Sequence, residues 1–104
     1  MVEIKVVKYE DRCAVGRNWC RTSLKIVTGK GVYWLRVREP YEEDEYYVVP
    51  ESCKSKRRSP WTVRRKGMVK GPARETVLYF DIMDDKKETV LASCSTDIIN
   101  VTNK

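Results

Sequence analysis

Apolar and polar residues alternate with a period of two along much of this chain, which is typical of β-strands that are buried on one side. Residues 2–9 place three β-branched side chains at even positions, with Glu3 and Lys5 between them. This stretch is therefore predicted to be a strand with one apolar and one charged face. Residues 10–18 follow with a Gly and an Asn and are predicted to be a loop.

The stretch 22–39 contains two runs rich in β-forming residues on either side of a Thr-Gly-Lys-Gly sequence. Gly29 and Gly31 can adopt the positive φ that a tight turn requires, so the pattern predicts a β-hairpin. Leu24 and Ile26 are expected to face the core, together with Trp34 or Leu35 depending on the register.

A second hairpin is predicted over residues 75–94, with the polar turn Asp-Asp-Lys-Lys between two apolar runs. Leu78, Phe80 and Ile82 alternate with their neighbours and are the expected core face. Asp81, Asp84 and Asp85 are interpreted as turn residues, because Asp favours turns through local hydrogen bonds.

Shorter strands are predicted at 45–49, 61–65 and 96–102, and Pro50 is expected to end the first of them because it has no N–H to donate. Residues 66–74 are predicted to be a loop, and any helix is expected to be short, near 40–45. Seven or eight short strands indicate an all-β fold, either a small antiparallel β-sandwich or a partly open β-barrel. A chain of 104 residues fits one domain, 1–104.

The charge of the chain is concentrated in one segment. Residues 54–74 contain nine Lys or Arg and no Asp or Glu, whereas the remaining residues hold 12 basic and 15 acidic groups, a net charge of −3. Charge gathered in one place produces a local potential that an even distribution would not. We call residues 54–74 the basic segment.

The basic segment is the candidate site for a polyanion, most plainly nucleic acid bound with low sequence specificity, because cations contact phosphates and displace counterions. The aromatic ring of Trp61 is the candidate for base stacking. The candidate binding residues are Lys54, Lys56, Arg57, Arg58, Trp61, Arg64, Arg65, Lys66 and Lys70. If 61–65 is a strand, Trp61, Val63 and Arg65 share one face, and the alternate residues form a basic stripe on the other.

Two alternatives to nucleic acid stay open at this point. The basic segment is also compatible with another acidic macromolecule, or with a solvated loop that Trp61 anchors to the core. The acidic residues 42–45 have no Ca²⁺-loop pattern and are interpreted as a solvated loop. Their charge could pair with the basic segment in a homo-oligomer, so the second hypothesis is a protein-interaction or assembly module, as a virion component or secreted inhibitor, that uses charged patches or an exposed strand edge.

The four cysteines are interpreted as forming one or two structural disulfides, with Cys13–Cys20 and Cys53–Cys94 as the favoured pairing and the other two connectivities left open. Buried free thiols are the alternative. Zinc would require closer Cys pairs, often with His, and this sequence has no His. No metal or cofactor is therefore expected. Without His or a phosphate-binding or nucleophile motif, no catalytic residues are assigned and the chain is expected not to be an enzyme.

Composition gives an expectation about the environment of the protein. The chain has no Gln, few Asn and 35% charged residues, which is the trend of hyperthermophile proteins. Glu3 and Lys5 interrupt the first apolar stretch, so it does not resemble a secretory signal. Together these features favour an intracellular protein of a hyperthermophile or its virus over a secreted one. No apolar run approaches the length of a membrane span, and no membrane association is expected.

Overall fold

The computed structural model describes the backbone of residues 2–14, 17–40, 43–54, 60–66 and 74–101, and the side chains of these residues outside 11–20, 65–66, 74 and 100–101. Nine strands and one short 3₁₀ helix, η1 (Glu51–Lys54), lie within these residues. The strands are β1 (Glu3–Ala14), β2 (Arg17–Val27), β3 (Trp34–Arg38), β4 (Glu45–Val48), β5 (Trp61–Lys66), β6 (Arg74–Thr76), β7 (Tyr79–Met83), β8 (Val90–Ser95) and β9 (Ile99–Val101).

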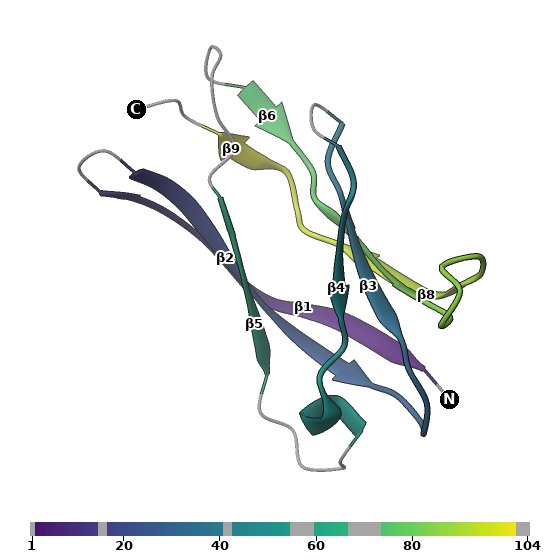
Figure 1. The fold of residues 1–104 in the computed structure, drawn as a ribbon. Helices are drawn as coiled ribbons and strands as arrows, with labels where there is room; N and C mark the ends of the chain where they lie inside the picture. The colour runs from purple at the N-terminus through teal and green to yellow at the C-terminus, as the bar shows by residue number, and fades with distance from the viewer. Residues whose placement is uncertain (1, 15–16, 41–42, 55–59, 67–73, 102–104) are drawn as a thin grey trace.

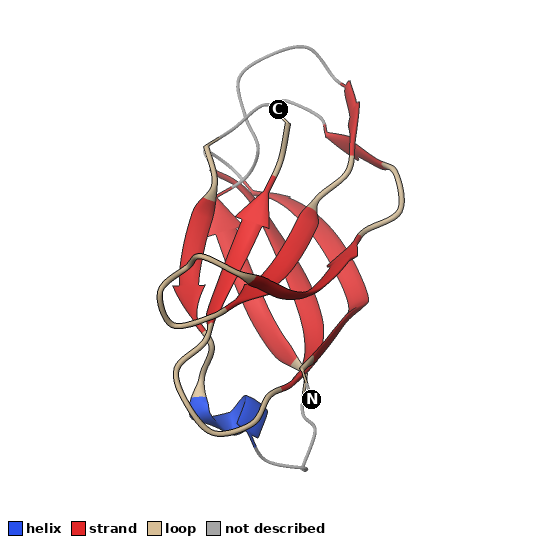
Figure 2. Ribbon diagram, turned by 90° about the vertical axis from the view of Figure 1, so that its right-hand side faces the viewer, coloured by secondary structure: helices blue, strands red, loops and turns tan. Residues whose placement is uncertain are grey.

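The strands form two main antiparallel sheets and a small ribbon. One sheet has the order β1-β2-β5, the other has the order β4-β3-β7-β8, and β6 pairs with β9. Figures 1 and 2 show the two sheets as layers, with the β6–β9 ribbon at one end and η1 at the other. The predicted all-β class, a small antiparallel sandwich or partly open barrel, is confirmed.

The two layers approach each other closely along one side of the sandwich. There β1 of the first sheet lies beside β8 of the second. On the opposite side the edge strands are β5 and β4, which are joined in the chain through η1. The arrangement is therefore intermediate between a sandwich and a barrel that is open between β4 and β5.

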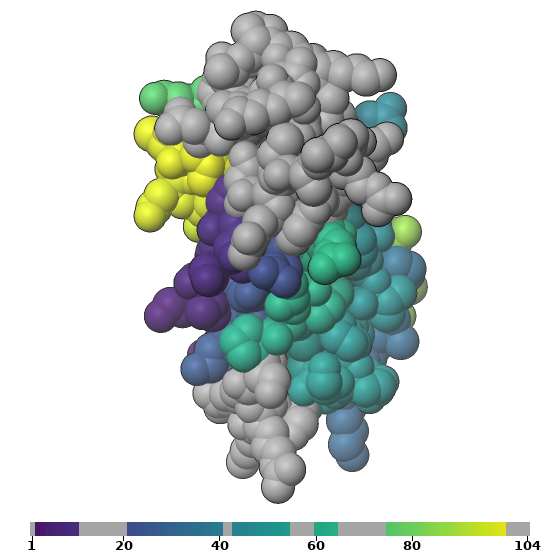
Figure 3. Space-filling model, turned by 90° about the vertical axis from the view of Figure 1, so that its left-hand side faces the viewer, coloured from purple at the N-terminus to yellow at the C-terminus, as the bar shows by residue number. Residues whose placement is uncertain are grey.

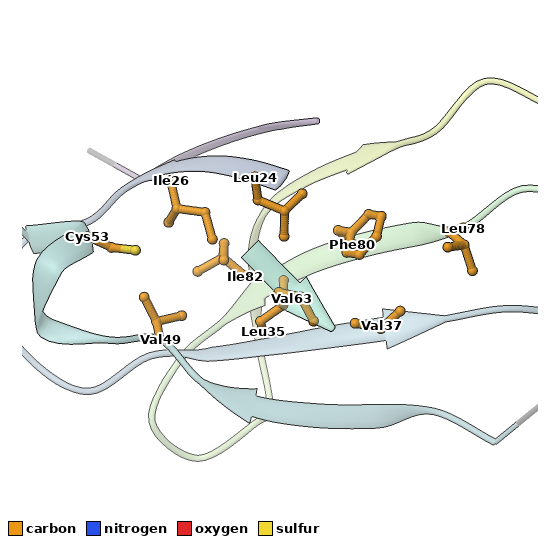
Figure 4. Close-up of a cluster of buried hydrophobic side chains, with 10 residues drawn as sticks. All are labelled: Leu24, Ile26, Leu35, Val37, Val49, Cys53, Val63, Leu78, Phe80 and Ile82. Atoms are coloured by element: carbon orange, nitrogen blue, oxygen red, sulfur yellow. The ribbon is translucent and has the colours of Figure 1, made fainter. Parts of the chain in front are cut away.

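The core lies between the sheets and consists of aliphatic side chains around one Phe. Leu24, Leu35, Leu78, Phe80 and Ile82 are all fully buried. Figure 4 shows Leu24 and Val63 from the first sheet facing Leu35 and Ile82 from the second, with Cys53 at one end and Leu78 at the other. The expected core positions of the 75–94 hairpin and of residues 24, 26 and 35 are therefore confirmed, and Trp34 takes the half-buried outward position.

The hairpin predicted over 22–39 is not formed. β2 and β3 belong to different sheets, and residues 28–33 carry the chain from one layer to the other. The apolar faces of the two strands thus lie against each other across the core, which buries both, whereas a hairpin would set them side by side on one sheet. Gly31 has a φ of 115°, as the turn chemistry predicts, but Gly29 does not have a positive φ.

Two further predictions about local structure are corrected. The expected loop at 10–18 is largely strand, because β1 and β2 continue through it as a long hairpin with a bulge between Val6 and Lys8. The short helix lies at Glu51–Lys54 rather than near 40–45, and it begins directly after Pro50, whose carbonyl accepts the Cys53 N–H at 3.0 Å. The predicted strands at 45–49 and 61–65 are present, and Ile99–Val101 of the predicted 96–102 strand forms β9. The predicted 75–94 hairpin is formed by β7 and β8, whereas residues 75 and 76 belong to β6, which pairs with β9.

The predicted Cys53–Cys94 disulfide is also wrong, because both thiols are free. Cys53 lies on η1 beside β2, whereas Cys94 lies on β8, which neighbours β1 and β7. These elements do not bring the two residues within the short Cα separation that a disulfide requires. The side chains of Cys13 and Cys20 lie outside the described residues. The β1–β2 register sets Cys13 opposite Asn18 and Cys20 opposite Asp11, so the two cysteines are not a directly opposed pair.

Within the described residues, no helix is long and apolar enough to cross a bilayer.

Candidate nucleic-acid interface

Strand β5 of the basic segment is part of the β1-β2-β5 sheet, and the structure describes side chains on both of its faces. It pairs with β2 so that Arg64 stands opposite Arg21 and Thr62 opposite Ser23. Val63 is buried in the core, whereas Thr62 and Arg64 are exposed. The alternation predicted for this strand therefore holds for the described side chains, and Arg64 projects from the outward face of the β1-β2-β5 sheet.

That outward face is cationic because the polar positions of β1 and β2 carry Lys and Arg. Leu24 and Ile26 point into the core, so Lys25 between them points outward, and the register sets Lys5 of β1 directly opposite it. We define the basic face as the outward side chains of the three strands. Its charged members with described side chains are Glu3, Lys5, Lys8, Glu10, Arg21, Lys25 and Arg64. Figure 3 shows this side of the molecule, with β1 in purple, β2 in blue and β5 in green.

Cations outnumber carboxylates among the side chains of the basic face that the structure describes. Glu10 accepts a hydrogen bond from Arg21 at 3.0 Å and lies 3.8 Å from the Lys8 ammonium. Among the described residues, Lys5 and Lys25 have no ion-pair partner. Like charges directly opposite in a sheet are destabilising, and Lys5 with Lys25 is such a pair. An anion laid across the strands would relieve that repulsion.

The predicted site residues fall into three groups. Arg64 lies on the basic face, and Trp61 is half-buried at the start of β5, where it packs against the hydrophobic core. Lys54 lies on η1 and donates to Glu51 at 2.7 Å, which offsets its charge locally. The backbone of residues 65 and 66 lies in β5, but their side chains lie outside the described residues, and Lys56, Arg57, Arg58 and Lys70 lie outside them entirely. Their binding roles remain predictions.

Sequence reasoning missed four cations of the basic face. Lys5, Lys8, Arg21 and Lys25 all come from outside residues 54–74. The signal was present, since each occupies a polar position of a period-two strand. What the sequence did not reveal is that β5 pairs with β2 and so places its own cations beside theirs.

The three aspartates near the second hairpin behave differently from one another. Asp84 caps the turn, because its Oδ1 accepts the N–H groups of Glu88 at 2.7 Å and Thr89 at 3.2 Å, and these hydrogen bonds lower its pKa. Asp85 is exposed within the same turn. Asp81 is not a turn residue at all, since it lies inside β7 and its side chain is only 1% exposed.

Asp81 is bound by two arginines on the outward side of the β4-β3-β7-β8 sheet. Arg36 and Arg38 donate to it from the neighbouring strand β3, and Ser93 donates from β8. Burial by itself would raise the pKa of Asp81, but the hydrogen bonds from Arg38, Ser93 and Arg36 outweigh it, so the pKa lies below its ordinary value. The carboxylate is therefore ionised near neutral pH and fixes the two guanidinium groups.

Metal chemistry finds no support in the described part of the chain, where no three His, Cys, Asp or Glu side chains are grouped as metal ligands. Burial raises the pKa of Cys94 to about 11 and raises that of Cys53, which keeps both thiols protonated near neutral pH.

Comparison of the chain with protein-family models, with curated proteins and with solved structures found no match to any of them.

Proposed function

We propose that this protein is a non-enzymatic binding domain that holds a polyanion, most plainly nucleic acid, with low sequence specificity. The phosphate contacts come from the basic segment together with the basic face. Because such contacts neutralise phosphates rather than bond to base edges, they bind many sequences alike.

One observation carries the proposal, which is the pairing of β5 with β2. It places Arg64 of the basic segment opposite Arg21, on the same face as Lys25 and Lys5. The cations of separate stretches of sequence thereby form one surface across three strands. Neighbouring strands lie about 4.8 Å apart, so the two outer strands of the face are about 10 Å apart, which suits a backbone of repeated phosphates better than a single small anion.

The test is the salt dependence of binding to a labelled duplex of mixed sequence. Binding measured by fluorescence anisotropy between about 50 and 200 mM salt should weaken steeply, as counterion release requires. The variant Lys5→Ala/Lys25→Ala should bind more weakly and lower the steepness of the log–log slope by up to about 2, since each phosphate contact contributes about 0.9. A slope near zero for the parent protein contradicts the proposal.

A matched control separates the surface from the net charge. Lys30→Ala/Lys86→Ala removes the same charge from exposed positions away from the basic face and should leave the slope unchanged. A third variant with Arg57, Arg58, Arg64 and Arg65 changed to Ala tests the basic segment and should also lose affinity. Equal losses in the lysine variant and in the control would show that only overall charge matters.

Assembly with a second protein chain is the alternative function, and the sheet edges favour it. β4 and β5 are both edge strands, and Asp44 and Glu45 beside or within β4 are acidic whereas β5 is basic. Exposed edges of opposite charge can pair between copies. Size-exclusion chromatography at low and high salt, without nucleic acid, tests this alternative. Oligomers that form at low salt and dissociate at high salt would favour assembly over nucleic-acid binding.

A further inference from the structure

The β4-β3-β7-β8 sheet has a second polar surface on the side away from the core. Leu35 and Val37 of β3 are buried, so Trp34, Arg36 and Arg38 between and beside them lie on the outward side. The register sets Tyr46 of β4 opposite Arg36. We define the tyrosine face as this outward surface, whose members are Trp34, Arg36, Arg38, Tyr46, Tyr79 and Lys87, held around Asp81.

Asp81 fixes the two arginines of the tyrosine face in place. Its Oδ2 accepts from Arg36 Nε at 3.0 Å and from Arg38 Nε at 2.7 Å, and its Oδ1 accepts from Arg38 Nη2 at 3.2 Å. These bonds use only part of the five N–H donors of each guanidinium. The side chains remain 20% and 41% exposed, so the other donors can contact an anion at little further cost in side-chain entropy.

Aromatic rings lie between these cations. Tyr46 and Tyr79 are each 39% exposed, and the Arg38 guanidinium lies 5.0 Å from the centroid of the Tyr79 ring. The Lys87 ammonium lies 4.1 Å from the centroid of the Trp34 ring and 4.7 Å from the centroid of the Tyr46 ring. The rings are therefore presented at the surface, and exposed cations are the groups that cover them.

We propose that the tyrosine face binds single-stranded nucleic acid. Bases stack on Tyr46 and Tyr79, and the backbone phosphates contact Arg36, Arg38 and Lys87. The proposal rests on the proposed function for the class of ligand, and it adds a second site and a preference for unpaired strands.

The distribution of charge and aromatic rings selects this occupant. On the sheet itself, Arg36 and Arg38 surround the single carboxylate of Asp81, which is already saturated by hydrogen bonds, so this part of the face has an excess of positive charge. The adjoining turn carries Lys86 and Lys87 against Asp84, Asp85 and Glu88. Alternation of cations with aromatic rings suits a single strand, which offers phosphates and unstacked bases together. A duplex keeps its bases stacked inside, where the rings cannot reach them.

The geometry places the two tyrosines at different bases. Tyr46 lies on β4 and Tyr79 on β7, with β3 between them, so their strands are about 10 Å apart. Lys87 lies on the exposed turn between β7 and β8, and its ammonium occupies the space over Tyr46 that a base would take. A bound strand displaces the ammonium, which then contacts a phosphate.

The test compares single-stranded and duplex probes of the same sequence, each labelled with fluorescein and measured by anisotropy. Tyr46→Ala/Tyr79→Ala should weaken binding to the single strand by at least about tenfold, since each stacked base contributes a sizeable share of affinity. Duplex binding, which uses the basic face, should stay within about twofold. Tyr46→Phe/Tyr79→Phe keeps both rings and should bind the single strand like the parent protein.

A readout on the parent protein covers the case in which the alanine variant is unfolded. The Trp34 indole N–H donates to the Asp85 carbonyl at 3.1 Å, beside Lys87, and its signal in a ¹H–¹⁵N spectrum should move when the single strand is added. An unmoved signal, or an equal loss of both probes in the alanine variant, overturns the inference. Only the inference about the tyrosine face fails if the parent protein binds the duplex with a steep salt slope while Tyr46→Ala/Tyr79→Ala keeps full affinity for the single strand. If the parent protein binds neither probe, the proposed function fails as well.

Discussion

Replacement of Asp81 by Asn removes the charge at the centre of the tyrosine face while keeping the shape of the side chain. In the native protein the carboxylate accepts four hydrogen bonds, three from the guanidinium groups of Arg36 and Arg38 and one from the Ser93 hydroxyl. Asn offers one oxygen as acceptor and turns an NH₂ group toward donors. The Asp81→Asn variant therefore loses acceptors and leaves two arginines without their counter-charge.

The expected loss of unfolding free energy is about 2–3 kcal/mol. Removing one partner of a buried ion pair costs about 3–5 kcal/mol when the other charge stays buried. Here the arginine side chains are 20% and 41% exposed, so they regain part of their hydration, and the lower end applies. Equilibrium urea unfolding followed by tryptophan fluorescence measures the change, and the m-value should stay constant.

The pH dependence gives an independent check on the cause. The pKa of Asp81 is lower in the folded protein than its ordinary value of about 3.9, so the unfolded chain binds more protons between the two values. The stability that this carboxylate contributes is complete above about pH 4 and is lost as pH falls through the folded pKa. The difference between parent and Asp81→Asn should therefore shrink below about pH 4.

Asp85→Asn is the matched control, because it makes the same change at an exposed carboxylate in the adjoining turn, and its effect should be within about 0.5 kcal/mol. The reasoning is refuted if Asp81→Asn costs no more than this control. It is also refuted if the difference between parent and Asp81→Asn is the same at pH 7 and in acid.

Two further predictions concern the backbone and the thiols. Gly31→Ala should destabilise the fold by about 1–3 kcal/mol, because φ at this position is 115°, although the added methyl group would make only an ordinary van der Waals contact with the Tyr33 ring. Gly29→Ala, at a position without a positive φ, should be neutral or slightly stabilising in the same unfolding assay. In the Cys13→Ser/Cys20→Ser variant, Cys53 and Cys94 should react slowly with a disulfide reagent near pH 8 while the protein is folded, and completely after unfolding. The reaction rate of the folded protein should rise toward pH 11, where the Cys94 thiol ionises. Failure to detect both thiols after unfolding would contradict the free-thiol structure.

The period-two pattern was sufficient to predict the strands and much of the core, because a strand buried on one side must alternate. Leu78, Phe80 and Ile82 were expected in the core and are fully buried there. The 75–94 hairpin was also predictable, since its polar turn leaves the strands adjacent in sequence and in space. The two faces of β5 followed in the same way, with Val63 inward and Arg64 outward.

Predictions from the sequence were wrong where the pairing of strands or side chains depends on segments that are distant in the chain. The 22–39 stretch has the composition of a hairpin, yet β2 and β3 separate into two layers because that arrangement buries both apolar faces. The Cys53–Cys94 disulfide was predicted from the even number of cysteines, which carries no information about which elements are neighbours in the fold. Asp81 was interpreted as a turn residue because nothing local indicates that Arg36 and Arg38, more than 40 residues earlier, stand beside it.

By itself, the sequence determined the all-β class, the strand faces and the concentration of positive charge in residues 54–74, because alternation and charge are local properties of the chain. Only the tertiary structure decided that β5 joins β1 and β2 in one cationic surface. Only the tertiary structure also decided that, on the outward side of the other sheet, the buried carboxylate of Asp81 fixes two arginines between exposed aromatic rings. Both arrangements depend on strand order and register, which are set by the burial of all the apolar faces together and by no single segment.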